Sequence, residues 1–153
     1  LATHASPHGG LTHDTITKDG PSVHILHLAD NAGFGLGLMR LYEVDKDAKI
    51  LQAAAALGDF ILEELPDPNG GGFFGSTEDP DAVGVFKARR KPFEDNVTAI
   101  RFLARLERAQ PKDAYRKAIS RTLRAIATPD QIKKQGRFLG DFLLALEESK
   151  GVR

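Results

Sequence analysis

Carboxylates in two similar short motifs are the side chains of this sequence most suited to chemistry. Asp30 lies in "HLADN", and Glu94 and Asp95 lie in "PFEDN". Two carboxyl groups at one site can act as general acid and general base on a sugar. Glu94 is the best candidate for the acid, because Ala29 at the matching position of the first motif indicates that the fold needs no carboxylate there.

The two aspartates also have a structural interpretation. Asp is a favoured N-cap residue, and its carboxylate is stabilised by the dipole at a helix N-terminus. Both Asp30 and Asp95 stand directly before segments with helical periodicity. The sequence therefore leaves open whether these residues begin helices, act on a ligand, or do both.

All the histidines lie in the first 27 residues, which suggests either a metal site or a set of loop residues. They are His4, His8, His13, His24 and His27. If "SVHILHL" is extended, His24 and His27 point to opposite faces and cannot share a metal, so no metal is expected. His13, beside Asp14, is a candidate general base, and His27 is a candidate ligand-binding residue at a rim.

A cluster of cations in "FKARRKPF" is the third candidate site. Lys87, Arg89, Arg90 and Lys91 lie close together between two phenylalanines. Arg89, Arg90 and Lys91 are candidates for binding a phosphate or an acidic sugar. The alternative is an exposed hairpin edge that is protected by charge.

The composition excludes several classes of function. The 153 residues contain 21 basic and 21 acidic side chains, so no overall positive field attracts nucleic acid or an anionic membrane. No apolar run is long enough to span a bilayer. Cysteine is absent, and with it disulfides and thiolate chemistry. We expect a single cytoplasmic domain over residues 1–153. The start at Leu1 rather than Met suggests a piece of a longer chain.

The sequence contains an internal repeat. "GGLTHDT" at Gly9 is echoed by "GGFFGST" at Gly71, and "LADNAGFGLGLMRLYE" is echoed 65 residues later by "FEDNVTAIRFLARLER". The first copy contains Gly33, Gly35 and Gly37, which resemble a phosphate-binding loop. The second copy has no glycine at these positions and has a helical pattern. We therefore predict a helix whose glycines serve close packing, with no nucleotide or other cofactor.

The repeat predicts an all-α fold of helical hairpins joined by short β-like loops at one rim. The repeat units cover about 9–65 and 71–127, and the expected helices cover 31–43, 47–64, 96–110, 112–127 and 137–149. The first helix of each unit is apolar nearly all round and should lie inside, with the second helix outside. Brief alternation in the loops between 71 and 90 also predicts a small hairpin.

Hairpins of this length, with an inner and then an outer helix, resemble an (α/α)6 toroid. The segments "LADNAGFGLGLMRLYEVDKDA", "GGGFFGS" and "RRKPFEDN" are similar to the thioredoxin-domain-containing proteins of the spermatogenesis-associated type. The resemblance implies a six-hairpin, glycosidase-like toroid, of which this chain supplies only part. The thioredoxin-like domain of that family has no counterpart here, since the chain lacks both cysteine and a βαβ pattern.

Two functions follow from this resemblance and these residues. The first is a non-catalytic or cryptic toroid segment that binds a partner or small ligand through its concave face. The alternative is a carbohydrate-active domain, either glycosidase-like or sugar-epimerase-like, that uses carboxylates at the toroid mouth. Because repeat units bury their faces against neighbours, we also expect association with a second copy or with the missing toroid portion.

Overall fold

The computed structural model describes residue 6, residues 9–13 and residues 25–151, which form helices connected by loops. The α-helices are α1 (Leu28–Asp45), α2 (Ala48–Glu64), α3 (Phe93–Ala109), α4 (Asp113–Ile126), α5 (Pro129–Gln135) and α6 (Gly140–Ser149). Two short 3₁₀ turns, η1 (Gly84–Lys87) and η2 (Gly136–Leu139), complete the set. Within the described ranges there is no strand, only two isolated β-bridges. The expected all-α class is confirmed.

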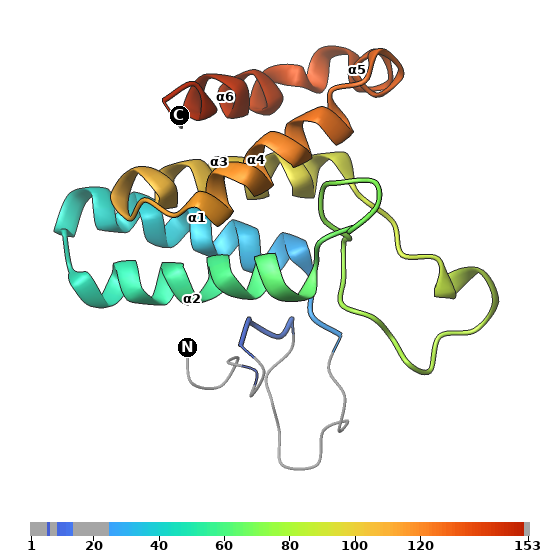
Figure 1. Ribbon diagram of the computed structural model, residues 1–153, viewed down its shortest axis with the longest axis horizontal. Helices are drawn as coiled ribbons and strands as arrows, with labels where there is room; N and C mark the ends of the chain where they lie inside the picture. Colours follow the sequence, from blue (N-terminus) through green and yellow to red (C-terminus); the bar gives the residue numbers. More distant parts are fainter. Residues whose placement is uncertain (1–5, 7–8, 14–24, 152–153) are drawn as a thin grey trace.

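The helices form two hairpins and a further helix on one side of them. Figure 1 shows α1, α3 and α6 running in the same direction, whereas α2 and α4 return antiparallel to them. The helix α3 packs between α1 and α6, and each of α2 and α4 packs on the helix that precedes it. The core is centred on α3, whose side chains Phe102, Leu103 and Leu106 are fully buried. The inner row is therefore α1, α3 and α6.

The repeat predicted from the sequence has a precise structural basis in two asparagines. The Asn31 side chain accepts a hydrogen bond from the Leu11 N–H (2.7 Å) and donates to the carbonyl oxygens of Leu11 (3.2 Å) and His27 (2.7 Å). The Asn96 side chain makes the same three bonds with the Phe73 N–H (2.7 Å), the Phe73 carbonyl (2.9 Å) and the Pro92 carbonyl (2.8 Å). Each buried amide thus ties a rim loop to the start of an inner helix.

Glycine pairs precede the residues that these asparagines hold. Gly9 and Gly10 in the first unit, and Gly71 and Gly72 in the second, all have positive φ values between 68° and 80°. Side-chain-bearing residues rarely adopt this conformation, so the paired glycines allow each loop to reach its asparagine. Equivalent residues in the two units have the same role, which confirms the repeat.

The glycines of α1 lie in a helix, as predicted, but only one of them serves close packing. A Cβ atom at Gly35 would lie 2.6 Å from the Phe102 ring, whereas Cβ atoms at Gly33 and Gly37 would meet nothing within 4 Å. This helix lies in the inner row as expected, but part of its apolar surface is uncovered. Phe34 is 41% exposed and Leu41 is 46% exposed, because no described element packs on that face.

Ion pairs join the inner helices. The Arg101 guanidinium contacts Asp141 (2.6 Å) and Glu148 (3.1 Å), both on α6. Arg105 contacts Glu148 (2.5 Å) and also Glu43 on α1 (2.6 Å). Burial alone would raise the pKa of Glu148, but its hydrogen bonds with Arg101 and Arg105 outweigh this effect and lower it. These pairs hold α1, α3 and α6 in register.

Several predicted boundaries need correction. The inner helices begin at Leu28 and Phe93, so Asp30 and Asp95 lie in the first turn and not at the N-cap. Pro129 does not only end the preceding helix; it also begins α5, because proline fits the first turn of a helix. The expected hairpin between 71 and 90 is absent, and its "GVFK" segment forms η1 instead.

Candidate functional site

The candidate site lies at the rim where the inner helices begin. His27 immediately precedes α1, and Asp95 lies in the first turn of α3. The Leu28 N–H donates to the Gly75 carbonyl (3.0 Å) and the Thr77 N–H donates to the Leu26 carbonyl (2.9 Å), so the loop after the glycine pair lies beside the start of α1. Figure 1 shows the rest of this loop projecting beyond the helix ends.

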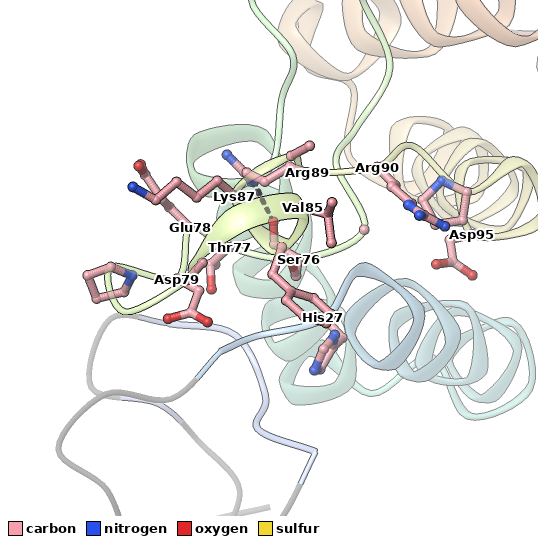
Figure 2. A pocket seen from close by; sticks show the side chains of 16 residues that line it. His27, Ser76, Thr77, Glu78, Asp79, Val85, Lys87, Arg89, Arg90 and Asp95 are labelled. Atoms are coloured by element: carbon pink, nitrogen blue, oxygen red, sulfur yellow. Dashed lines mark hydrogen bonds between the residues drawn. The ribbon is translucent and has the colours of Figure 1, made fainter.

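A cavity of about 690 Å³ lies between this loop and the helix starts. Its walls are His27, Asp95, and parts of the loop that runs from Gly75 to Pro92 (Figure 2). The loop contributes both acids, such as Glu78 and Asp79, and cations, such as Lys87 and Arg90. This volume is sufficient for a small polar ligand such as a sugar.

Asp95 is the carboxylate that an inner helix contributes to this cavity. Its side chain is half-buried at the start of α3. Burial raises the pKa of Asp95, the carboxylates of Glu94 and Asp30 raise it further, and His27 lowers it. A carboxyl group in such surroundings retains its proton to higher pH than an exposed aspartate, which suits a general acid.

The two histidines that the structure describes lie close to these carboxylates. The Nδ1 atom of His13 is 3.1 Å from Oδ2 of Asp30, and the rings of His13 and His27 meet edge to face with centroids 6.1 Å apart. The predicted partner of His13, Asp14, lies outside the described residues, as do His4, His8 and His24. No cluster of three metal-binding side chains occurs in the part of the chain that the structure describes.

The fourth predicted catalytic residue lies farther from the cavity. Glu94 is exposed on the first turn of α3 and does not line the cavity wall, although its charge acts on Asp95. The structure thus brings His13, Asp30, His27 and Asp95 to one rim and leaves Glu94 on the outside of that group. Asp30 and His13 also lie beside the cavity rather than in its wall.

The three cations of the predicted ligand-binding cluster differ in their surroundings. The Arg89 guanidinium stacks over the Phe74 ring at 4.1 Å and donates through Nε to the Ser76 carbonyl at 2.9 Å, the contact drawn in Figure 2. Burial lowers the pKa of Arg89. Lys91 donates to Asp67 (2.7 Å) and to the Gly71 carbonyl (3.1 Å). Arg89 and Lys91 therefore stabilise the rim loops through contacts within the chain.

Arg90 is the cation of this group that remains available to a ligand. Its side chain is exposed, lines the cavity and has no hydrogen-bond partner among the described residues. Figure 2 shows Arg90 on the same side of the cavity as Asp95. A cation beside a carboxyl group can orient a polar ligand by its hydroxyl or acidic oxygens.

Sequence reasoning missed the wall formed by Ser76, Thr77, Glu78 and Asp79. These residues follow the second glycine pair in "GGGFFGSTED", and that position was the available signal. It also missed the function of Asn31 and Asn96 as loop anchors. Their occurrence at the same place in both repeat units indicated a shared structural role.

Comparison with known proteins gave matches only among solved structures. No family model and no curated protein matches the chain. An α-1,6-mannanase of family 76 from Salegentibacter sp. superposes with a TM-score of 0.64 at 20% identity, over 80% of this chain and 35% of its own. A family 76 glycoside hydrolase from Bacteroides thetaiotaomicron gives 0.62 at 15% identity, over 82% and 27%. Cellobiose 2-epimerase from Spirochaeta thermophila gives 0.62 at 18% identity, over 83% and 34%.

These matches define the class of fold. The chain has the helical-hairpin architecture of the six-hairpin, glycosidase-like (α/α)6 toroids. It spans about a third of the length of the structures it matches. Nothing in the comparisons supports the more specific resemblance to thioredoxin-domain-containing proteins. No described helix is both long and apolar enough to cross a bilayer.

Proposed function

We propose that this chain is a segment of a carbohydrate-active toroid and that the rim cavity binds a sugar. The observation that carries the proposal is the half-buried Asp95 carboxyl, which lines a cavity together with His27 at the start of the inner helices. Three structurally similar proteins are a mannanase, a glycoside hydrolase and an epimerase that acts on cellobiose. This agreement supports the carbohydrate-active alternative over a purely structural segment.

In this proposal Asp95 is the general acid. Burial raises its pKa above that of an exposed aspartate, which makes it the better suited carboxyl to donate a proton to a glycosidic or ring oxygen. Asp30 accepts a hydrogen bond from His13 when the imidazole Nδ1 carries the proton, and this leaves Nε2 as the base. The acid comes from α3, and Asp30, which would orient the base, comes from α1, so the chemistry would take place between the starts of these two inner helices.

A property of one structural neighbour supports a role for adjacent carboxyl groups. The Salegentibacter mannanase was rendered inactive by replacing two consecutive aspartates with asparagine, and was then bound to α-1,6-mannotriose. This chain also has two consecutive carboxylates, Glu94 and Asp95, at the start of an inner helix. We therefore retain Glu94 as an electrostatic partner that raises the pKa of Asp95.

The second candidate function is a non-catalytic segment that binds a partner or small ligand. It is favoured by the limited span of the chain, about a third of its structural neighbours, which leaves the cavity open on one side. We propose in this case that the chain belongs to a larger protein of the thioredoxin-domain-containing type. Arg90 and the concave rim would then hold a partner or an anionic ligand without turnover.

Sugar binding to the 153-residue chain tests the first proposal. We expect α-1,6-mannotriose or cellobiose to shift the NMR signals of His27 and Asp95, and Asp95→Asn to abolish turnover of the bound sugar. Asp130→Asn, on the exposed start of α5, is the matched control and should leave both signals and turnover unchanged. Binding without turnover in the unaltered chain would favour the second function, and no binding of either sugar would contradict the first.

A further inference from the structure

One long face of α1 has no partner among the residues that the structure describes. It includes Phe34 (41% exposed), Leu41 (46% exposed) and Val44 (79% exposed), together with the exposed Gly33 and Gly37. Cβ atoms at these two glycines would meet nothing within 4 Å. Glycine within a helix lowers its stability by about 1 kcal/mol relative to alanine, so two unused glycines beside three exposed apolar side chains indicate a surface made for contact.

The internal repeat indicates what kind of element covers this face. A shift of 65 residues places Phe34 on Ala99, Gly37 on Phe102 and Leu41 on Leu106. These three residues of α3 are fully buried, and Phe102 packs directly against α1. The exposed face of α1 is therefore the counterpart of the face by which α3 packs on the preceding hairpin, through Phe102 on α1 and Leu106 on α2. A further inner helix, parallel to α1, fits there.

Charge supplies the second indication. The same shift places Arg40 on Arg105, which pairs with Glu43 of the preceding inner helix at 2.6 Å and with Glu148 of the following one at 2.5 Å. Arg40 is exposed and has no acidic partner among the residues that the structure describes. The missing helix should therefore carry a carboxylate close to Arg40.

The other end of the inner row offers a helix with these properties. The face of α6 that points away from α3 carries Leu143 (60% exposed) and Leu144 (48% exposed). The Glu147 side chain is 69% exposed, and its one ion pair among the described residues is with Lys150, the C-cap residue of the same helix. This face has apolar side chains for the glycine-lined surface of α1 and a carboxylate for Arg40.

We propose that α6 of a second copy of this chain packs on the exposed face of α1, and that the reciprocal contact closes the ring. Leu143 and Leu144 would enter the space beside Gly33 and Gly37, and Glu147 would pair with Arg40. Each copy supplies three inner helices, α1, α3 and α6, so two copies supply the six of an (α/α)6 toroid. In this arrangement α6 of one copy is followed by α1 of the other, so the order α1, α3, α6 continues around the ring. The two copies are related by a two-fold axis, so the assembly is closed. It does not depend on the proposed sugar chemistry.

Sedimentation equilibrium and light scattering of the 16.6 kDa chain test the stoichiometry. We expect a mass of twice that value at high protein concentration, and dissociation on dilution. A chain that stays monomeric at all concentrations overturns the proposal and leaves both faces to helices outside these residues. A mass that keeps growing with concentration also overturns it, because an unclosed head-to-tail contact gives filaments.

A charge exchange tests the surface itself. Arg40→Glu and Glu147→Arg should each weaken the dimer about tenfold or more, since each places like charges together. The double variant, and an equal mixture of the two single variants, should both recover the dimer, because each restores opposite charges between α1 and α6. Weakening without recovery would show that α1 pairs with another surface, and would overturn the proposal.

Two further variants separate association from folding. Gly37→Gln should abolish the dimer while making the monomer slightly more stable, because the added side chain meets open space in the monomer. Arg124→Glu, a charge reversal on the exposed face of the outer helix α4, is the control and should leave the dimer intact. A dimer that survives Gly37→Gln, or is lost with Arg124→Glu, contradicts the assigned surface.

Discussion

The ring of Phe102 lies against the backbone of Gly35, where a Cβ atom would come within 2.6 Å of the ring. Gly35→Ala should therefore lower the free energy of unfolding by about 2 kcal/mol, as overpacking of a core does. Gly33→Ala and Gly37→Ala should each raise it by up to about 1 kcal/mol, because their Cβ atoms meet nothing within 4 Å. Urea unfolding at low protein concentration measures all three.

The three variants share one chemical change in one helix, so they control for each other. If Gly35→Ala is as stable as its two neighbours, the close contact between α1 and α3 is wrong. The three variants should keep the same order of stability in thermal unfolding. There, a change of about 1 kcal/mol in the free energy of unfolding shifts the melting temperature by about 2–4 °C for a chain of this size.

The buried amide of Asn96 should be among the most sensitive positions of the chain. Asn96→Ala removes three hydrogen bonds and deprives the buried Phe73 N–H and Phe73 carbonyl of this partner, whereas the Pro92 carbonyl still accepts from the backbone N–H of residue 96. The free energy of unfolding should fall by about 3 kcal/mol. Asn96→Asp keeps the shape of the side chain but replaces the donating amide nitrogen by an oxygen, which would face the carbonyl oxygens of Phe73 and Pro92. It should also be destabilising, and less so at low pH, where a protonated carboxyl can donate. Denaturant unfolding at pH 4 and pH 7 checks both variants.

Glu148 makes stability depend on pH in a defined direction. Its pKa in the folded chain is lowered, so its contribution is present above the ordinary glutamate pKa and is lost as pH falls through the folded value. Glu148→Gln should be less stable at pH 7 by about 2 kcal/mol, since Arg101 and Arg105 lose a charged partner. The difference between the two chains should shrink steadily below about pH 4.5. A difference that is constant with pH would contradict the ion pairs.

The titration of Asp95 reports on the rim without any assumption about turnover. Burial and the nearby Glu94 both raise the pKa of Asp95, whereas His27 lowers it. Glu94→Gln should therefore lower the pKa of Asp95, and His27→Gln should raise it. Carbon-detected NMR of the side-chain carboxyl measures both shifts. A pKa of Asp95 equal to that of an exposed aspartate in the unaltered chain would contradict the half-buried position.

The internal repeat made most of the helices predictable from the sequence. The packing around the glycines of α1 was not predictable. Helical periodicity in the second copy identified the first copy as a helix despite Gly33, Gly35 and Gly37. Their separate environments depend on where Phe102 lies in the neighbouring helix, and one sequence does not contain that information. Likewise, Asp30 and Asp95 were expected at helix starts, but the helices begin two residues earlier because Asn31 and Asn96 bind the preceding carbonyls.

The sequence indicated where in the chain the candidate residues lie, but not how their side chains are arranged. His13, Asp30, His27 and Asp95 do lie at one rim, as the shared loop-to-helix position indicated. The pairing of His13 with Asp30 spans 17 residues, and local spacing favoured Asp14 instead. Arg89, Arg90 and Lys91 looked equivalent in the sequence. They differ because Phe74 contacts Arg89 and Asp67 contacts Lys91, whereas the Arg90 side chain has no such contact within the described part of the chain.

The projecting loop is closed at its base. The Gly75 N–H donates to the Arg90 carbonyl (2.8 Å), and the Arg89 side chain donates to the Ser76 carbonyl. These hydrogen bonds join the first residues of the loop to its last residues. The polypeptide between these points can change in length and composition without moving α1 or α3. Homologues could therefore acquire new selectivity by exchanging this segment alone, and grafting a foreign loop between Thr77 and Ala88 should be tolerated by the remainder of the chain.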